Sequence, residues 1–432
     1  MGKGTAIKSV TAREIFSGRG HPAIEATVIT ENGATGVAVA TAGLSVGEHE
    51  VQFAYDGGKR WNGQGVLKAV GFVREIIAPA LRGIDASIQG EIDAILLKLD
   101  GTPNKAKLGG NTTASVSAAA LKAGAASLGI PLYQHVGGVN ACILPTPGVG
   151  ILNTLVKYGG GAKGGDKPSY AYMTYGYNSF SEASYACWEV RTAFEKLLDK
   201  KFNLKTAGSY RVVIPPGTIQ HEKEVWDVMA EAIVISGNSS RIGIQVDVAA
   251  STFYNKEKGV FEGLFSIENK SRDDLIALYR DMVKNYPFVV LEDPLGEDDF
   301  EGHAILTREL GIQIVGDDLF TTNVERLKQG MAVGACNSVL LKVNQIGTIS
   351  EAFDTVQLAY NNGYGVMPCA SRGEGADIAD YAVGLGTGNI RESGLDQTAN
   401  RLLQIEAELG SRAKFLGKAG FKFGPVVKPP GK

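Results

Sequence analysis

Cysteine is scarce in this chain of 432 residues, and the four cysteines that are present do not pair along the sequence. Cys142, Cys187, Cys336 and Cys369 lie far apart and form no Cys-x-x-Cys pair. That spacing argues against a zinc knuckle and against a disulfide scaffold, and it fits a protein of the reducing cytosol.

Long hydrophobic runs and an excess of one charge are also missing. No apolar run approaches the roughly 20 residues that cross a bilayer, and no apolar stretch follows the charged start of the chain, as a signal peptide requires. The formal net charge is −3, which gives no reason to expect a nucleic-acid partner. We therefore expect a cytoplasmic protein that binds neither membrane nor nucleic acid.

The composition is that of a large globular protein. Apolar residues make up 44% of the chain and charged residues 21%, which is ordinary for a soluble domain. The chain is too long for one ordinary core. Its first part reads as strands followed by helices, whereas strands and helices alternate from about residue 143. We expect an α/β protein with an N-terminal α+β domain at 1–142 and a β/α barrel at 143–432.

The expected elements follow from β-branched runs, helical patterns and turn residues. Three strands are expected at 9–16, 23–30 and 34–40, with a tight hairpin at Asn32-Gly33. A glycine-rich loop, Thr41-Ala-Gly-Leu-Ser-Val-Gly47, follows them. Helices are expected at 66–81, 86–99, 111–128, 179–200, 221–236, 270–285, 299–310, 323–332, 347–362 and 399–409.

Four strand-like runs in the second half of the chain each end on a charged residue. The runs are Ile242-Gly-Ile-Gln-Val-Asp247, Phe288-Val-Val-Leu-Glu292, Ile312-Gln-Ile-Val-Gly-Asp317 and Ser338-Val-Leu-Leu-Lys342. The steps from 247 to 292, from 292 to 317 and from 317 to 342 are 45, 25 and 25 residues. A step of about 25 residues or more fits one β/α unit, and the carboxyl ends of barrel strands face one shared pocket.

The residue types at these strand ends indicate a metal site beside a base. Asp247, Glu292 and Asp317 offer only oxygen ligands, which suit Mg²⁺ or Mn²⁺ better than zinc. Lys342, held close to a cation, should have a lowered pKa and act as the base that takes a proton next to a substrate carboxylate. A lone acid at a strand end is usually a solvated or capping residue, so the prediction rests on the four residues together.

Several stretches of the chain resemble the enolases (phosphopyruvate hydratases). They run in order from about residue 7 to 424 and match at similar spacing. These stretches are Arg19-Gly-His-Pro22, Ile130-Pro-Leu-Tyr133, Leu291-Glu-Asp-Pro294, Glu297-Asp-Asp299, Gln313-Ile-Val-Gly-Asp-Asp-Leu319, Leu341-Lys-Val-Asn-Gln-Ile-Gly-Thr348, Gly363-Tyr-Gly-Val-Met367, Val383-Gly-Leu-Gly-Thr-Gly388 and Leu403-Gln-Ile-Glu-Ala-Glu-Leu-Gly410.

The resemblance implies a small N-terminal α+β domain that caps an enolase-type (β/α)8 barrel of unusual strand order. It also implies a lyase, a dependence on Mg²⁺, and a homodimer or higher homo-oligomer. Position by position, Asp247, Glu292 and Asp317 match the metal ligands of the family, and Lys342 matches its catalytic base.

The chain departs from the family pattern at several positions around that pocket. Val212, within Tyr210-Arg-Val-Val-Ile214, stands where enolases carry a general acid, and Ser169 stands where they carry a supporting glutamate. The substrate-closing histidine of the early loop is replaced within 158–165. Ala42 replaces a serine that binds a second metal, and Arg391 replaces a lysine that pairs with the substrate carboxylate.

One further segment changes the predicted anion-binding side chains. The Ser-His-Arg-Ser segment of enolases reads Cys369-Ala-Ser-Arg372 here, which removes a histidine and displaces the phosphate-binding arginine by one position. Arg372 and Arg391 are the candidates for binding an anionic substrate, because a planar guanidinium matches a carboxylate or phosphate. Ser371, Ala42 and Gly43 complete the candidate substrate-binding set. New contacts from the altered loop are sought among Lys163, Asp166, Lys167, Tyr170 and Tyr172.

Three hypotheses remain open from the sequence. The first is an Mg²⁺-dependent, enolase-like lyase that abstracts the proton α to the carboxylate of a small phospho- or phosphonate-bearing acid other than 2-phosphoglycerate. The second is a phosphopyruvate hydratase that converts 2-phosphoglycerate to phosphoenolpyruvate with rearranged helper residues. The third is a non-catalytic enolase-like binding protein. A general acid contributes about 10²–10⁴ in rate, so its replacement by Val212 favours the first.

Overall fold

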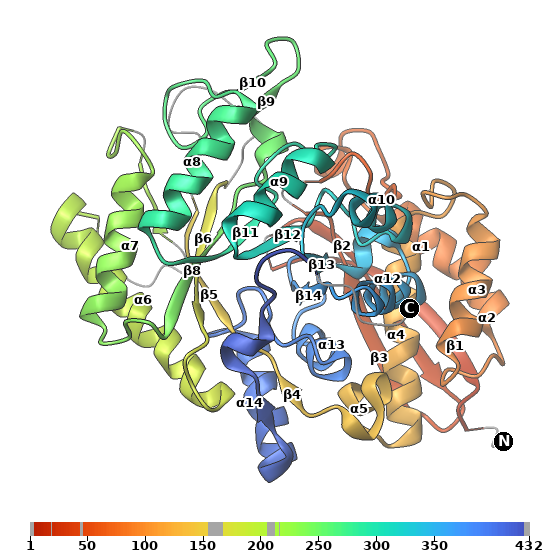
Figure 1. Cartoon of the computed structure of the whole chain (residues 1–432). Coiled ribbons are helices and arrows are strands. Elements are labelled where there is room, and N and C mark those ends of the chain that lie inside the picture. Colours follow the sequence, from red (N-terminus) through yellow and green to blue (C-terminus); the bar gives the residue numbers. More distant parts are fainter. Residues whose placement is uncertain are drawn as a thin grey trace.

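The structure is a computed structural model, and it describes residues 4–18, 20–43, 46–153, 167–204, 212–215 and 217–426. A small domain of strands and helices lies against one side of a larger β/α barrel (Figure 1). The predicted division of the chain at 142/143 falls just before the short strand β4 (Ile143–Leu144), and this exact boundary stays a prediction.

The small domain is built on an antiparallel sheet in the order β1-β2-β3. Its strands are β1 (Ile7–Phe16), β2 (Pro22–Thr30) and β3 (Thr35–Ala40). The hairpin predicted at Asn32-Gly33 joins β2 to β3, and Gly33 takes the positive φ of 86° that the turn requires. Alternating residues of β2 and β3 are buried, so one face of the sheet packs on helices.

Helix α4 (Gly110–Leu128) covers the buried face of that sheet. Its small residues permit a close approach: a Cβ built on Gly36 of β3 would lie 2.0 Å from the carbonyl oxygen of Ala119. Ala119 and Ala123 are fully buried in this contact. The small side chains of this Ala- and Ser-rich helix therefore let it pack closely on the sheet.

The other helices of the small domain flank α4. The segment predicted as one helix at 66–81 is divided by a π-helical turn, whereas the helix predicted at 86–99 forms as a single element. The elements are α1 (Leu67–Phe72), the π turn η2 (Val73–Ile77), α2 (Ala78–Leu81), α3 (Gln89–Asp100) and α5 (Leu132–Gly137).

The larger domain contains a sheet in the order β14-β13-β12-β11-β8-β6-β5-β7. Most neighbours are parallel, but β6 runs antiparallel to both β5 and β8. The strands are β5 (Gly148–Asn153), β6 (Ser169–Thr174), β7 (Val212–Val213), β8 (Ile242–Asp247), β11 (Phe288–Glu292), β12 (Gln313–Gly316), β13 (Ser338–Leu341) and β14 (Gly365–Pro368).

The segment 388–391 closes this sheet into a barrel. It pairs with β14 through the bridges Val366–Gly388 and Cys369–Arg391, and with the lead-in to β5 through Thr146–Asn389. The residues that the sequence predicted at four strand ends therefore lie on adjacent strands of one closed barrel.

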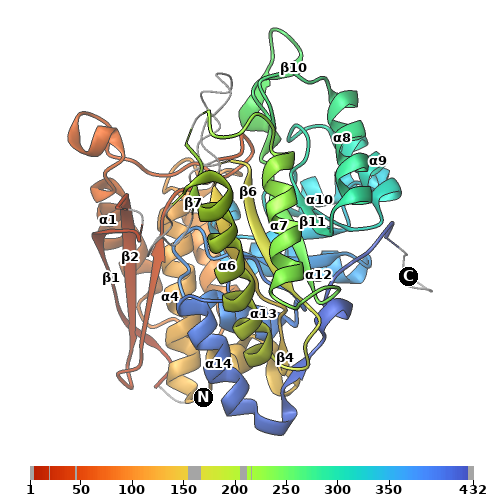
Figure 2. The same cartoon turned by 90° about the vertical axis from the view of Figure 1, so that its left-hand side faces the viewer.

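Helices surround the barrel on its outside (Figures 1 and 2). Each of the seven helices predicted from residue 179 onward is present, with its ends within two residues of the prediction, whereas α11 and α13 were not predicted. The helices are α6 (Phe180–Phe202), α7 (Lys223–Ile235), α8 (Arg272–Asn285), α9 (Phe300–Leu310), α10 (Val324–Val333), α11 (Val343–Ile346), α12 (Ile349–Asn361), α13 (Asp377–Leu385) and α14 (Gln397–Leu409). Short strand pairs join β4 to β15 (Lys414–Phe415) and β9 (Tyr254–Asn255) to β10 (Val260–Phe261).

Within the described part of the chain, no single helix is long and apolar enough to cross a membrane. The one pair of helices that passes this test together, 110–128 with 132–140, is bent by 97°.

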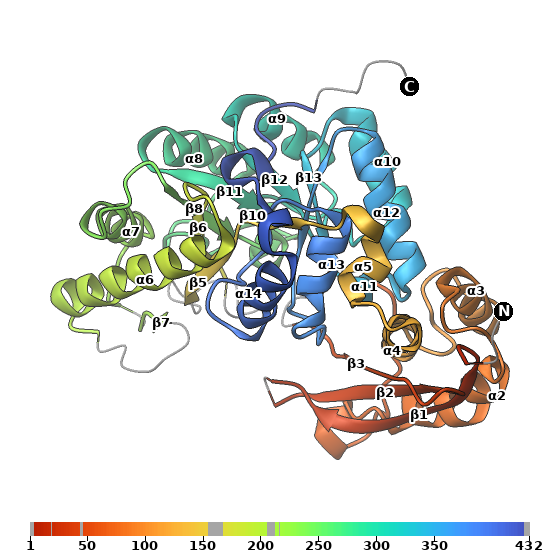
Figure 3. The ribbon, with the colours of Figure 1, turned by 90° about the horizontal axis from the view of Figure 1, so that it is seen from below.

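Figure 3 shows the small domain against one side of the barrel. The polar contacts between the two, Asp93–Ser350, Lys105–Glu351 and Glu50–Arg372, are here called the domain seam. Asp93 of α3 accepts hydrogen bonds from both the hydroxyl (2.7 Å) and the N–H (2.8 Å) of Ser350 on α12. Lys105 forms an ion pair with Glu351 at 2.8 Å, and the 41–51 segment adds the contacts described below. The seam fixes the loop after β3 against the ends of the barrel strands.

Candidate active site

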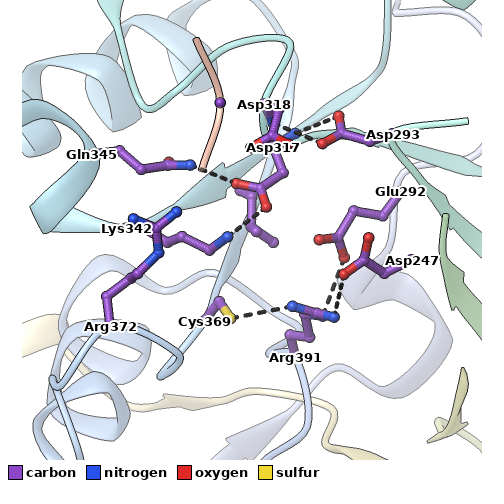
Figure 4. Close-up of polar contacts among 12 residues, drawn as sticks. Asp247, Glu292, Asp293, Asp317, Asp318, Lys342, Gln345, Cys369, Arg372 and Arg391 are labelled. Atoms are coloured by element: carbon purple, nitrogen blue, oxygen red, sulfur yellow. Dashed lines mark hydrogen bonds and ion pairs between the residues drawn. The ribbon is translucent and has the colours of Figure 1, made fainter. Parts of the chain in front are cut away.

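The four predicted strand-end residues lie on four neighbouring strands, β8, β11, β12 and β13 (Figure 4). Glu292 pairs directly with Asp247 in the parallel register of β11 and β8. Asp317 follows the last residue of β12 and Lys342 follows that of β13. All four are at most 5% exposed. The structure therefore brings the predicted residues to the same end of the barrel.

Lys342 and Asp317 form an ion pair inside the barrel mouth. The Lys342 Nζ donates to Asp317 Oδ2, and Gln345 Nε2 donates to Asp317 Oδ1 at 2.7 Å. Burial raises the pKa of Asp317, but Lys342, Arg372 and Arg391 outweigh that effect and lower the pKa to about 2. The Asp317 carboxylate is thus charged and held on both oxygens.

The pKa of Lys342 departs from the expectation. Burial lowers this pKa, but the negatively charged neighbours of the ammonium, Asp317 first among them, together raise it by more, so the pKa of Lys342 lies above its usual value. The expected lowering is therefore not produced by the neighbouring side chains, because the nearest charge to the ammonium is a carboxylate.

Arg391 lies between the other two predicted ligands. Its Nη2 donates to Asp247 Oδ2 at 2.5 Å, and its Nε lies 3.2 Å from Glu292 Oε2. Nη2 also lies 3.2 Å from Ser169 Oγ, and Nη1 donates to Cys369 Sγ at 3.5 Å. The substituted arginine is thus fixed in the pocket, with its guanidinium against two acids.

Lys167 is a second cation on Asp247. Its Nζ donates to Asp247 Oδ2, and burial, followed by the charge of Arg391, lowers the pKa of Lys167 to about 7. Of the residues suggested for new contacts, Lys167 reaches the site. We call Asp247, Glu292, Asp317, Lys342, Arg391 and Lys167 together the strand-end cluster.

The oxygen atoms of this cluster fit a hard divalent cation in type. Glu292 Oε1 is buried and has no hydrogen-bond partner in the described part of the chain, so one carboxylate oxygen remains available. The predicted trio Asp247, Glu292 and Asp317 is nevertheless not the tightest group of acids. Of the described residues, the acids whose oxygens lie within 4.8 Å of one another are Asp293, Asp317 and Asp318.

The role of Asp293 in that tighter group is structural. Its two oxygens accept the backbone N–H groups of Asp317 (3.0 Å) and Asp318 (2.7 Å), which shapes the turn after β12. Burial raises the pKa of Asp293 well above its usual value, and Asp318 and Asp317 raise it further. Asp293 therefore positions Asp317, and no motif in the sequence analysis predicted that role.

The predicted substrate-binding residues lie at the domain seam. Arg372 forms an ion pair with Glu50 of the small domain, and its carbonyl oxygen accepts the Thr41 N–H at 3.0 Å. Ala42 and Gly43 directly follow Thr41 and are half-buried, as is Ser371. Their part in substrate binding stays a prediction. Glu50 and Gln345 were missed, and nothing in the sequence indicated their partners.

The other departures from the family pattern are placed as follows. Val212 pairs with Leu152 of β5 and is buried, so an apolar side chain occupies that position. The Tyr170 hydroxyl accepts from Trp226 Nε1 at 2.9 Å, and Tyr172 donates to the Met229 carbonyl at 3.1 Å. Both tyrosines thus belong to the core beneath α7, and the suggestion that they contact substrate is wrong. Lys163, Asp166 and the segments 158–165 and 210–211 lie outside the described residues, as does Arg19.

Comparison with known proteins covers nearly the whole chain. Residues 7–136 match the family described as "Enolase, N-terminal domain", and residues 141–423 match "Enolase, C-terminal TIM barrel domain". The chain is 41% identical over 426 residues to a protein named Enolase from Methanocaldococcus jannaschii, covering 95% of this chain and 97% of that protein. Proteins of the same name from Methanopyrus kandleri and Pyrococcus furiosus are each 42% identical, over 428 and 425 residues, with the same coverage. The predicted resemblance and fold class are confirmed.

Proposed function

The chain belongs to the enolase family, and from that premise we propose that it is a lyase that removes the proton α to the carboxylate of a small acid. The observation that supports this most is the placement of Lys342. Its ammonium lies in the barrel mouth, 4% exposed, in an ion pair with Asp317, and Glu292 and Asp247 end the next two strands of the sheet. Burying a lysine among acids is costly unless every charge is matched, and a base at this position serves proton abstraction.

We assign the metal of the family to the same cluster. Asp247, Glu292 and Asp317 would hold Mg²⁺, with Mn²⁺ as the alternative. When bound, such an ion stabilises the negative charge that develops on the substrate carboxylate as the α-proton leaves.

Each side chain of the chain itself has a proposed task. Lys342 Nζ would accept the α-proton in its neutral amine form, and Asp317, which is itself held by Gln345, orients that amine. Arg391 binds the substrate carboxylate through its planar guanidinium.

The proposed substrate differs from 2-phosphoglycerate. Elimination of hydroxide needs a proton donor, and Val212 offers none at the position where the family carries its acid. The substrate is therefore an acid with a better leaving group, or one that undergoes proton exchange at its α-carbon without elimination. In this proposal the protein works in the cytoplasm as a homodimer or higher homo-oligomer.

A second candidate function is the dehydration of 2-phosphoglycerate to phosphoenolpyruvate. The relatives that support it are named Enolase and share about two fifths of their residues with this chain. In that case a residue other than Val212 must donate the proton to the leaving hydroxide.

Deuterium incorporation tests the proposal and separates the two candidates. The protein with Mg²⁺ in D₂O is incubated with a panel of small 2-hydroxy acids and their phosphate esters, beside a Lys342→Ala variant. We expect deuterium at the α-carbon of at least one acid, lost in Lys342→Ala. Appearance of phosphoenolpyruvate from 2-phosphoglycerate at a rate typical of enzymes would select the second candidate. No Lys342-dependent exchange across the panel, with no Mg²⁺ binding, would contradict both.

A further inference from the structure

Arg372, which the sequence singled out for a substrate anion, is engaged by a carboxylate of the protein itself. Its Nη1 donates to Glu50 Oε2 at 2.5 Å, and its Nη2 donates to Glu50 Oε1. Both side chains are 1% exposed. Two parallel N–H···O bonds are the geometry by which arginine binds a carboxylate or phosphate. Glu50 therefore fills the fork of Arg372 as a substrate anion would.

The pair is held in place from both domains. Gly47 N–H lies 3.2 Å from Glu50 Oε1 and so fixes the carboxylate from the small domain. On the barrel side, Asn344 Nδ2 donates to the Arg372 carbonyl at 2.5 Å, and Arg372 N–H donates to Glu374 Oε2 at 2.9 Å. Displacing Glu50 would leave a buried carboxylate without its cation, which is strongly unfavourable.

Arg372 lies close enough to Lys342 for its pairing with Glu50 to affect which substrate binds. Asn344, which anchors it, is two residues after Lys342. Among the charges that act on Lys342 and on Asp317, that of Arg372 is one of the largest. Figure 4 shows the Arg372 side chain beside Lys342, on the side away from Arg391. Released from Glu50, this guanidinium would bind a second anionic group of a substrate whose carboxylate is on Arg391.

We propose that Glu50 is a specificity-determining residue that withholds Arg372 from the substrate, so that the site takes acids whose one anionic group is the α-carboxylate. This inference rests on the proposed function, and it revises the expectation of a phospho- or phosphonate-bearing acid. The two arginines have different partners: Arg391 contacts Asp247 and Glu292 at the ends of the barrel strands, whereas Arg372 ties the small domain to the barrel.

Equilibrium binding tests the proposal without requiring turnover. Titration calorimetry compares glycerate with 2-phosphoglycerate, two acids that differ by one phosphate, on the full-length protein with Mg²⁺. The wild type is expected to bind the two acids within about threefold of each other. Glu50→Gln is expected to bind 2-phosphoglycerate at least about tenfold more tightly than the wild type does, since one charge-assisted hydrogen bond supplies that much. Glycerate affinity stays unchanged, and Arg372→Gln added to Glu50→Gln removes the gain.

Glu48→Gln is the matched control, because it removes a negative charge from the same loop without touching Arg372. Glu48 is exposed and pairs with Lys256 at 3.0 Å. This control should leave the ratio of the two affinities at its wild-type value. An equal gain in Glu48→Gln would mean that only net charge matters, and it would overturn the proposal.

If Glu50→Gln folds poorly, the binding of the two acids to the wild type alone still tests the proposal. A wild type that binds 2-phosphoglycerate ten or more times more tightly than glycerate overturns it outright. Failure of the proposed function would give a different result, the absence of Lys342-dependent proton exchange. The ratio of the affinities for 2-phosphoglycerate and glycerate would still test the role of Glu50.

Discussion

Two regions of the molecule hold buried charge, and they are built in different ways. The strand-end cluster draws its residues almost wholly from neighbouring barrel strands, and Asp247 and Glu292 are direct partners in the sheet register. The domain seam joins residues far apart in sequence, such as Glu50 with Arg372, 322 positions away. In the cluster the backbone places the charges. In the seam the packing of one domain on another places them.

The difference suggests a division of labour between the regions. The cluster brings three acids and three cations together, and Glu292 Oε1 has no hydrogen-bond partner among the described residues, which suits a site that binds a ligand. The seam pairs Glu50 with Arg372 on both oxygens, which suits a fixed joint. Substitutions in the cluster should change chemistry most, and substitutions in the seam should change stability most.

The largest expected effect is on chemistry, from Asp317→Asn. This change keeps the shape of the side chain but removes the charge that orients Lys342, so α-proton exchange should fall by about 10²–10⁴. NMR detection of deuterium uptake measures it. Asp354→Asn, on the exposed face of α12, is the control and should keep the wild-type rate. An exchange rate in Asp317→Asn within threefold of the wild-type rate would contradict the expectation that substitutions in the strand-end cluster change the chemistry most.

A large effect on stability is expected from Glu50→Ala at the seam. Removing the carboxylate leaves the Arg372 guanidinium buried and unpaired, which costs about 3–5 kcal/mol of unfolding free energy. Urea denaturation followed by circular dichroism measures the loss. Glu48→Ala should change the unfolding free energy by less than about 1 kcal/mol, because its ion pair is exposed. Equal losses of unfolding free energy in the two variants would show that the Glu50–Arg372 pair does not stabilise the contact between the domains.

The sequence predicted the cluster far better than the seam. Asp247, Glu292, Asp317 and Lys342 could be found because strand periodicity and the spacing of β/α units fix where strands end. Glu50 could not, since the position of its partner depends on how the small domain docks. Tyr170 and Tyr172 were misjudged because β6 is buried on both faces, so nearness to a variable loop did not place them in the pocket.

The helices show the same limit. Long amphipathic helices such as α6 and α8 were predicted, and serine caps begin both of them. Helices α5, α11 and α13 were not predicted. Each is short, and none has a side-chain N-cap hydrogen bond that would mark its start.

A moderate effect on binding is expected from Arg391→Lys within the cluster. Lysine keeps the charge but cannot contact Asp247, Glu292 and a substrate carboxylate through one planar group. Substrate affinity should fall by about tenfold, with a smaller change in unfolding free energy than in Glu50→Ala. Calorimetric titration of the acid that shows exchange gives the affinity. An unchanged affinity would remove Arg391 from the binding site.

The smallest effect concerns a buried histidine outside both regions. Burial lowers the pKa of His303 on α9, where Nδ1 contacts the Asp299 carbonyl at 2.7 Å. Below about pH 6.5 the unfolded chain takes up a proton that the folded state excludes, so stability falls as pH falls. Between pH 7.5 and 5.5, the wild type should lose on the order of 2 °C more in Tm than His303→Gln does. If Tm falls equally with pH in the two proteins, the prediction is wrong. A larger fall in the wild type would assign that part of the loss of stability in acid to His303, which lies outside both charged regions.

Chemical rescue shows whether the amine of Lys342 takes the α-proton. In Lys342→Ala the α-proton exchange should be lost, and added methylamine should restore part of it in a concentration-dependent way, because a free amine can occupy the space of the missing side chain. Trimethylamine, which is too bulky for that space, should restore far less. Wild-type exchange rates in Lys342→Ala without any amine would mean that another group takes the α-proton.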